Sequence, residues 1–398
     1  TQGSKLYSVL PADGVGDFTF SRNSAATRIN KDGLIETVAV GKSRLNYPLI
    51  DGVVNGCPSH LLEPQRLQLI QYSEAFDNAY WTKNGASVVS DAAISPDGSL
   101  NAFKLVEDTS TGAHLISRSL FGSGVNLAKY TLSVFAKKGE RDLLVIQDGT
   151  TVNNAFFDLT NGVVDGITGT GTAKIESLGN HFYRCSFTFT QSGVDLRPQF
   201  ALADITLSGS PPSYTGDGTS GFYIFGAQLE QGSYPTSYIP NYGTSAGITR
   251  VAETANGAGD ASTFNDSEGV LMVETKGEND GTFNYISLSD GGTTNYAGIL
   301  YTDTDNQITY RYYVGGSGVQ IIIENIIVTN FNKIAIKYKA NDFAIWINGI
   351  EVGTASSGSL NPSGTFNQLA FARGGSNNTP FYGNTKQIQY FDSALNDS

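Results

Sequence analysis

The feature that most constrains the fold is the stretch 226–250, which directly follows the aromatic run Phe222–Phe225 and, after Gly232, continues as a strap rich in proline and tyrosine. The prolines and tyrosines that define the strap are Tyr234, Pro235, Tyr238, Pro240 and Tyr242. Proline fixes its own φ, lacks an N–H donor and biases the preceding residue toward extended backbone, so this stretch can be neither a helix nor a central strand. We expect an ordered connector between two β-domains, with any flexibility confined to residues 243–247.

The composition favours many short strands joined by tight turns. Apolar residues make up 39% of the 398 residues, and 46 glycines, 20 tyrosines and 22 phenylalanines stand against one methionine. No long segment repeats with the period of a helix, and the chain is too long for one hydrophobic core. We predict an all-β chain with two antiparallel β-sandwich domains, 67–242 and 243–398, preceded by a short N-terminal docking segment, 1–66.

Two runs in the middle region, 130–136 and 181–189, alternate with period two and predict an antiparallel sheet with one wet face. The residues expected to face the core are Leu132, Val134, Ala136, Tyr183, Cys185, Phe187 and Phe189. The residues expected to face outward are Thr131, Ser133, Phe135, Arg184, Ser186 and Thr188. The run 222–225 is apolar on both faces and predicts a central, buried strand.

The third region holds further strand signals at the spacing of a sandwich. They cover residues 270–274, 283–288, 308–314, 321–328, 334–338 and 343–352. Within the last of these, Asn348-Gly349 predicts a hairpin, because both central positions of a type I′ turn need positive φ. The isoleucine-rich run 321–328 is expected to be central or covered by a partner chain, since exposed apolar strands aggregate.

The opening segment is turn-rich and too small for a core of its own. Phe18–Phe20 and Leu34–Val38 flank the turn signal Lys31–Gly33, which predicts a hairpin. We expect the segment to pack on a neighbouring domain or on another subunit. Three of its basic residues are candidates for docking to a partner, with surface ion pairs or contacts to backbone carbonyls as the alternative: Arg22, Arg28 and Arg44.

Charge and cysteine content exclude several classes of partner. The net charge is -12, so no nucleic-acid partner is expected, because phosphate binding needs a concentrated basic surface. No apolar run approaches the roughly 20 residues of a membrane helix, so no membrane insertion is expected. Cys57 and Cys185 are far apart and outside metal-binding spacing, which predicts two unpaired thiols.

Several motifs together resemble a group of bacteriophage virion proteins. The opening motifs are Phe20-Ser21-Arg22, Ala26-Thr27-Arg28, Leu61-Leu62-Glu63-Pro64-Gln65-Arg66 and Tyr72-Ser73-Glu74 with Phe76 and Trp81. The closing motifs are Gly226-Ala227-Gln228-Leu229-Glu230, Pro235-Thr236-Ser237-Tyr238-Ile239-Pro240 and Thr249-Arg250. The Trp346-Ile347-Asn348-Gly349 hairpin and residues 387–395 resemble a concanavalin or laminin-G-like domain.

The resemblance implies a jelly-roll module similar to carbohydrate-binding modules in the middle region and a concanavalin-like sandwich after it. It implies a non-enzymatic virion structural protein, a fibre, spike or decoration subunit made in the host cytoplasm and displayed on the particle surface. The implied partners are other virion proteins, further copies of the chain in a homo-oligomer with a trimer favoured, and host-surface glycans. Two alternatives stay open: a polysaccharide depolymerase or lyase, and a stand-alone glycan-binding module.

No catalytic residues stand out. His60, His114 and His181 form neither an HExxH motif nor an obvious triad, and each is expected to be structural. The sequence has no GxSxG elbow, and the motifs of jelly-roll lyases and the acidic strand of laminarinase-like sandwiches are missing. The sequence therefore shows no strand that could carry the paired carboxylates of a glycosidase.

Sugar binding needs an exposed aromatic plane and planar polar side chains. The candidates for glycan binding are Phe135, Arg184, Arg118, Tyr80 and Trp81, with core packing as the alternative for Trp81. No cofactor is required, and a structural calcium is compatible with the chain. Its candidate ligands are Asp303 and Asp305, and Asp97 near Asn101 offers similar oxygens, although aspartates in hairpin loops more often serve turn geometry.

Overall fold

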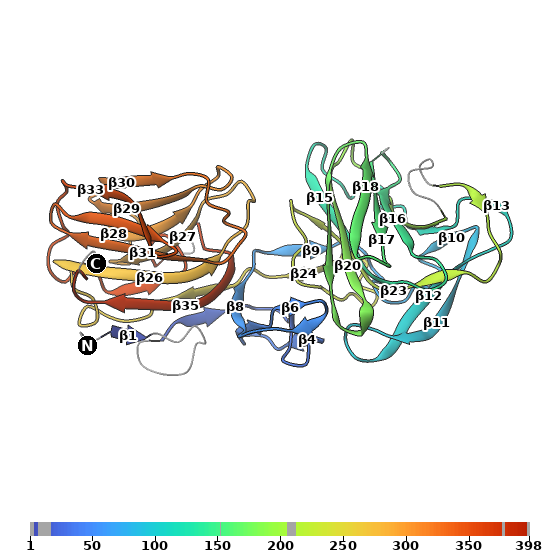
Figure 1. Cartoon of the computed structure of the whole chain (residues 1–398), viewed down its shortest axis with the longest axis horizontal. Coiled ribbons are helices and arrows are strands. Elements are labelled where there is room, and N and C mark those ends of the chain that lie inside the picture. Colours follow the sequence, from blue (N-terminus) through green and yellow to red (C-terminus); the bar gives the residue numbers. More distant parts are fainter. Residues whose placement is uncertain (1–3, 7–16, 152, 205–211, 376–378, 396–398) are drawn as a thin grey trace.

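The computed structural model describes residues 4–6, 17–151, 153–204, 212–375 and 379–395, and it is built from β-strands. Figure 1 shows two β-sandwiches side by side, with N-terminal strands such as β6 and β8 between them. A 3-10 turn, Gly179–His181, is the single helical element of the described residues. Within the same residues no helix is long and apolar enough to span a membrane. The predicted all-β fold with antiparallel sandwiches is confirmed.

The middle sandwich consists of two six-stranded antiparallel sheets. The first contains, in order, β10 (Thr82–Asn84), β14 (Leu115–Ser117), β21 (Pro198–Ala203), β16 (Leu143–Asp148), β17 (Asn154–Asp158) and β18 (Val163–Thr168). The second contains β11 (Ala86–Ile94), β12 (Leu100–Glu107), β23 (Gly221–Gln231), β15 (Lys129–Lys137), β20 (Tyr183–Thr190) and β19 (Thr172–Ser177). A short ladder joins β13 (Thr111–Gly112) to β22 (Tyr214–Thr215).

The alternation in the sequence correctly predicts which residues enter this core. Leu132, Val134 and Ala136 of β15 are fully buried between the sheets, together with Cys185 and Phe187 of β20. The strand β23, which leads into the strap, lies between β12 and β15. The predicted central position of residues 222–225 is therefore confirmed.

The predicted wet face of the second sheet is wrong where other segments cover it. Thr131 and Ser133 are each 1% exposed and Ser186 is 3% exposed. On this outer side Phe135 packs with Tyr238 of the strap in a small apolar cluster, whose other members are Ala102, Leu178, Phe182 and Phe225. This part of the face is buried because the strap and the N-terminal segment lie on it.

The C-terminal sandwich pairs an eight-stranded sheet with a five-stranded sheet. The larger sheet contains β33 (Ile350–Ala355), β32 (Phe343–Ile347), β31 (Asn332–Lys339), β26 (Glu268–Lys276), β35 (Gly383–Phe391), β8 (Ser59–Leu62) and β5 (Arg44–Asn46), with β1 (Ser4–Leu6) also on β35. The smaller contains β30 (Ser317–Ile323), β29 (Ile308–Val314), β28 (Tyr296–Tyr301), β27 (Asn284–Ser289) and β34 (Gln368–Ala370).

One hairpin prediction in this sandwich is confirmed and one strand prediction is partly wrong. Asn348 and Gly349 have φ of 53° and 85°, as a type I′ turn between β32 and β33 requires. The strand predicted for 321–328 ends at Ile323, because Asn325 turns the backbone with a φ of 64°. Its predicted central position is also wrong, since β30 is the end strand of its sheet and Ile322 is 49% exposed.

The N-terminal segment does not fold by itself but adds to its neighbours. Its strands β5 and β8 extend the larger C-terminal sheet, and β2 (Thr19–Ser21) pairs with β25 (Thr254–Asn256). The predicted hairpin exists, but its first strand is β3 (Ala26–Ile29) rather than Phe18–Phe20, paired with β4 (Ile35–Val38). The remaining ladders are β6 (Leu49–Ile50) with β7 (Val53–Val54), and β9 (Arg66–Gln68) with β24 (Ile248–Arg250).

Candidate functional site

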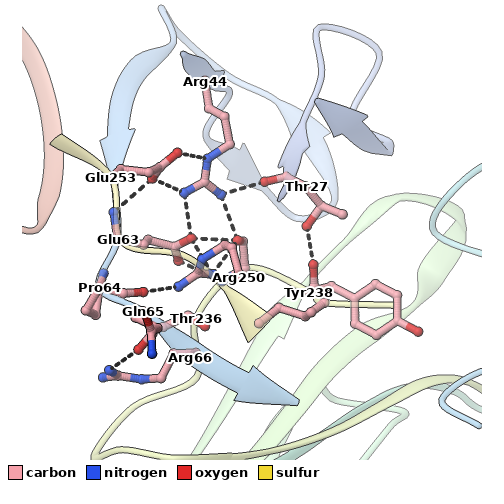
Figure 2. A network of polar contacts seen from close by, with 12 residues as sticks. Thr27, Arg44, Glu63, Pro64, Gln65, Arg66, Thr236, Tyr238, Arg250 and Glu253 are labelled. Carbon is pink, nitrogen blue, oxygen red and sulfur yellow. Dashed lines mark hydrogen bonds and ion pairs between the residues drawn. The ribbon is translucent and has the colours of Figure 1, made fainter. Parts of the chain in front are cut away.

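A buried ion network holds the N-terminal segment, the strap and the start of the C-terminal region together, and Arg44 of β5 is its centre (Figure 2). Arg44 is 0% exposed, and its Nη2 lies 2.7 Å from Oε2 of Glu63 while its Nε donates to Oε1 of Glu253 at 2.9 Å. Its Nη1 donates to the carbonyl of Thr27 and to Oγ of Ser237, both at 2.7 Å. All three segments therefore share one guanidinium.

Two further arginines complete the network. Arg22 Nη1 lies 2.6 Å from Glu253 Oε1, and Arg250 Nη1 lies 2.8 Å from Glu63 Oε2. Burial alone would raise the pKa of Glu63, but Arg250 and Arg44 hold it well below its usual range. Breaking a buried pair by removing one partner leaves an uncompensated charge, which makes this network a strict requirement of the junction.

The strap is fixed by the same network. Ser237 donates its backbone N–H to Glu63 Oε1 at 2.7 Å, and Thr236 donates its backbone N–H to Glu230 Oε1 at 2.8 Å. The Tyr238 hydroxyl lies 2.8 Å from Ser73 Oγ, and its ring is 4% exposed. The strap is thus an ordered part of the middle sandwich's outer face, as its prolines and tyrosines predict.

Above the network lies a cavity of about 940 Å³, which we call the inter-sandwich cleft. Its walls come from the N-terminal segment, the outer face of β19 and β20, the strap and one end of the C-terminal sandwich. The polar and aromatic lining residues include Asn46, Tyr47, Lys174, Glu176, Tyr183, Arg184, Tyr234, Lys276, Glu278, Phe331 and Asn384. Residues of both sandwiches therefore line the same cavity.

Charged groups in the cleft are of both signs. Lys174 Nζ lies 2.7 Å from Glu176 Oε1, and burial of Glu176, which would raise its pKa, is outweighed by Lys174 and Arg184, so the pKa stays below its usual value. Burial raises the pKa of Glu278 against the effect of Lys276. The pKa values of Glu176 and Glu278, two of the carboxyls that line the cleft, are therefore shifted in opposite directions.

The structure separates the five glycan-binding candidates into two groups. Arg184 lines the cleft, where its guanidinium lies 5.5 Å from the centre of the Phe135 ring and Nη2 donates to Ser133 Oγ at 3.2 Å. Phe135 itself is 2% exposed, so it supports Arg184 from below and offers no open plane to a sugar. Of this group only Arg184 stays a candidate.

The second group lies at the other sheet and is part of its packing. The Arg118 guanidinium covers the Tyr80 ring at 4.2 Å, and Tyr80 is 8% exposed. Trp81 is 2% exposed, stacks beside Phe76 and donates its indole N–H to the carbonyl of Tyr72 at 2.9 Å. The prediction of an exposed aromatic platform is therefore wrong for Tyr80, whereas the alternative of core packing holds for Trp81, because both rings fill the core.

The docking candidates are also placed inside the chain. Arg22 is 2% and Arg44 0% exposed, so neither side chain can reach a partner. Both arginines form ion pairs, as the alternative predicts, but these pairs are buried and not at the surface. Arg28 is half-buried, lines the cleft and pairs with Glu36 at 2.9 Å. The prediction missed the burial because an arginine in a turn-rich segment gives no sign of a distant carboxylate.

The remaining candidates do not converge on a site. Asp303 and Asp305 lie exposed in the turn between β28 and β29. No group of three or more His, Cys, Asp or Glu side chains that could hold a metal occurs within the described residues. His60 is 1% exposed, His114 is fully buried and His181 is exposed, and Cys57 and Cys185 are free as predicted.

Sequence reasoning missed most residues of the cleft, because they come from distant segments. Lys174 and Glu176 lie on β19, whereas Lys276 and Glu278 lie at the end of β26 and just after it. The one local signal was the outward position of Arg184, predicted from alternation in β20. No pattern in either sandwich alone shows that their ends face each other.

Comparisons with known proteins give little further information. No family model matches the chain, and no curated protein matches it. Among solved structures, the chain is similar to the mouse laminin alpha1 chain, domains LG4-5, at 10% sequence identity, with a TM-score of 0.26 over 89% of this chain and 96% of that chain. At so low a TM-score the likeness carries no argument about function.

Proposed function

We propose that this chain is a non-enzymatic binding protein that holds a glycan in the inter-sandwich cleft. The observation that carries the proposal is the lining, which combines the half-buried rings of Tyr47, Tyr183 and Tyr234 with amides such as Asn46 and Asn384. Aromatic rings stack on the apolar face of a sugar, and amides and charged pairs of both signs exchange hydrogen bonds with its hydroxyls.

A glycan array followed by calorimetry tests this proposal. Tyr47 is the residue to change, because its half-buried side chain lines the cleft and takes no part in the ion network. Tyr47→Ala should weaken binding of the best array ligand about tenfold, the loss expected for one stacking ring. Tyr313→Ala, which changes a half-buried tyrosine outside the cleft, is the matched control and should bind normally. Absence of any array ligand, or equal binding by the Tyr47 variant, would overturn the proposal.

The second candidate function is glycoside hydrolysis, favoured by the opposite pKa shifts of Glu176 and Glu278 in one cleft. Paired carboxyls with separated pKa values are the requirement for general acid and base roles. In this alternative Glu278 is the acid and Glu176 the base or nucleophile. Release of reducing ends from a polysaccharide panel, abolished in Glu278→Gln, would establish it, whereas binding without turnover supports the first proposal. Absorbance of unsaturated uronates in the same reactions detects a lyase.

The biological setting we propose is the surface of a bacteriophage particle, with the chain as a homo-oligomeric fibre, spike or decoration subunit. What supports it is the resemblance, whose motif residues Arg22, Glu63 and Arg250 all belong to the buried network. The network gives these motif residues a structural role at the junction, and the resemblance leaves the position in a virion open. Mass spectrometry of intact particles tests the setting, and light scattering at micromolar concentration should give the mass of a trimer rather than of a monomer.

A further inference from the structure

A second cavity, of about 290 Å³, lies at the edge of the middle sandwich, and we call it the edge pocket. It forms where residues 72–78, β11, β12 and the end of the strap meet, and it shares no lining residue with the inter-sandwich cleft. The side chains relevant here are Tyr72, Glu74, Asp91, Asn101, Phe103 and Tyr242. Nothing in the proposed glycan function uses this pocket.

Aromatic rings form its walls. Tyr242 is 73% exposed, although both its backbone and its hydroxyl have partners in the chain. A β-bridge joins its backbone to Tyr72, and its hydroxyl donates to Glu74 Oε1 at 3.3 Å. The ring is thus oriented before any ligand arrives, and Phe103, 7% exposed, contributes a third aromatic side chain.

The charge of the edge pocket is one-sided. Glu74 and Asp91 contribute carboxyls, and no lysine or arginine is among the described residues that line the pocket. Glu74 is fixed by the Tyr238 hydroxyl, which donates to Oε1 at 2.9 Å. Burial raises the pKa of Glu74, a cost that a bound cation would relieve.

One further observation marks the pocket as incomplete without a ligand. Asn101 uses its Nδ2 to donate to Asp97 Oδ2 at 3.1 Å, but its buried Oδ1 has no hydrogen-bond donor within the part of the chain that the structure describes. A buried acceptor without a donor is rare in native proteins and needs an explanation. Asp91 has a φ of 51°, a left-handed conformation that belongs to the irregularity in the β11–β12 pairing between Val89 and Ala93.

We propose that the edge pocket binds a primary ammonium group, carried by an amino sugar or by a small amine. Aromatic faces attract cations, carboxylates compensate the charge, and the N–H donors of an ammonium can satisfy the open acceptor of Asn101. A neutral sugar would leave the excess of negative charge unmatched. The two carriers share this chemistry and differ in whether the sugar ring adds contacts to Tyr242.

Titration calorimetry on the full chain at about pH 7 tests the proposal with three probes: glucosamine, N-acetylglucosamine and ethanolamine. Glucosamine should bind, and N-acetylglucosamine, which lacks the charge, should bind about tenfold more weakly. Ethanolamine as tight as glucosamine assigns the pocket to small amines, and clearly weaker ethanolamine assigns it to amino sugars. Equal binding of both sugars, or no binding of glucosamine and ethanolamine, would overturn the inference.

Two variants locate the binding. Tyr242→Ala removes an exposed ring, and Asp91→Asn removes a charge with a residue that tolerates the same positive φ, so both should fold. Each should weaken the binding of whichever amine the wild type prefers about fivefold or more. Tyr47→Ala in the cleft should leave amine binding unchanged, which keeps the two sites distinguishable. Unchanged binding in both pocket variants would contradict the assignment.

Discussion

The N-terminal segment is attached to the two sandwiches in different ways. To the C-terminal sandwich it adds backbone, since β8 pairs with β35 and Phe18 and Leu62 enter that core. On the middle sandwich it mainly places side chains, as Ile29 packs on the cluster around Phe135 and Tyr238. A strand ladder distributes its strength over many hydrogen bonds, whereas a side-chain contact depends on few residues. The joint with the middle sandwich should therefore be the one that single substitutions loosen.

The largest effect is expected where both joints meet, at Glu253. Glu253→Gln keeps the shape of the side chain but leaves Arg22 and Arg44 buried with one carboxylate fewer. The expected loss in the free energy of unfolding is about 3–5 kcal/mol. Urea denaturation followed by tryptophan fluorescence measures it.

The matched control is Glu36→Gln, which removes a carboxylate from the half-exposed pair with Arg28. A surface pair contributes little, so this loss should stay below about 1 kcal/mol. Equal effects of the two substitutions would mean that the buried network does not carry the junction.

The next effect concerns the side-chain joint alone. Tyr238→Ala removes a ring that packs on Phe135 at 5.5 Å and on Phe225 at 5.9 Å, which should cost about 3 kcal/mol and loosen the strap. Limited proteolysis should show faster cleavage within residues 232–250 and unchanged cleavage at β8 and β35. Tyr238→Phe, which keeps the ring, should lose about 1 kcal/mol. Unchanged protease resistance of the strap in Tyr238→Ala would refute its role as the contact point.

The strap shows how far sequence reasoning reaches in this chain. Proline and tyrosine spacing correctly predicts an extended, ordered segment, because each proline restricts the backbone locally. Gly226, by contrast, is explained only by the structure, since its φ is 59° and a Cβ there would lie 2.8 Å from Cδ2 of Phe135 on another strand. Period-two alternation likewise places most core residues of β15 and β20.

The burial of the outer face and the network could not be predicted in the same way. Arg44 and Glu253 are separated by 209 residues, and neither stands in a local pattern that indicates its partner. Phe135 has the alternation of an outward residue and is buried because a distant segment covers it. Local periodicity therefore predicts strands and faces, while the cleft depends on how three separate segments meet.

The smallest expected effect is a loss of stability at low pH. It concerns His60 of β8, the strand that joins the N-terminal segment to the C-terminal sandwich. His60 is 1% exposed, and neither ring nitrogen has a hydrogen-bond partner among the described residues. Burial, with a further contribution from Arg44, lowers the pKa of His60 to about 3. The unfolded chain takes up this proton below about pH 6.5 and the folded chain does not, so stability is complete above that pH and falls toward pH 3.

Between about pH 7.5 and pH 5.5 this difference in proton uptake should lower the free energy of unfolding by about 1.4 kcal/mol. The reason is that pH 5.5 lies about one unit below the pKa of histidine in the unfolded chain, and each unit is worth about 1.4 kcal/mol. Glu63, whose pKa is lowered, begins to lose its contribution only as pH falls into the usual carboxyl range, and the raised pKa values of Glu74 and Glu278 are shared by wild type and variant, so the difference between the two pH profiles isolates the histidine. His60→Leu should lose correspondingly less stability over the same interval, whereas His181→Gln, an exposed histidine, should behave like the wild type. Parallel pH profiles for the wild type and His60→Leu would show that His60 takes up its proton without opening the joint between β8 and β35.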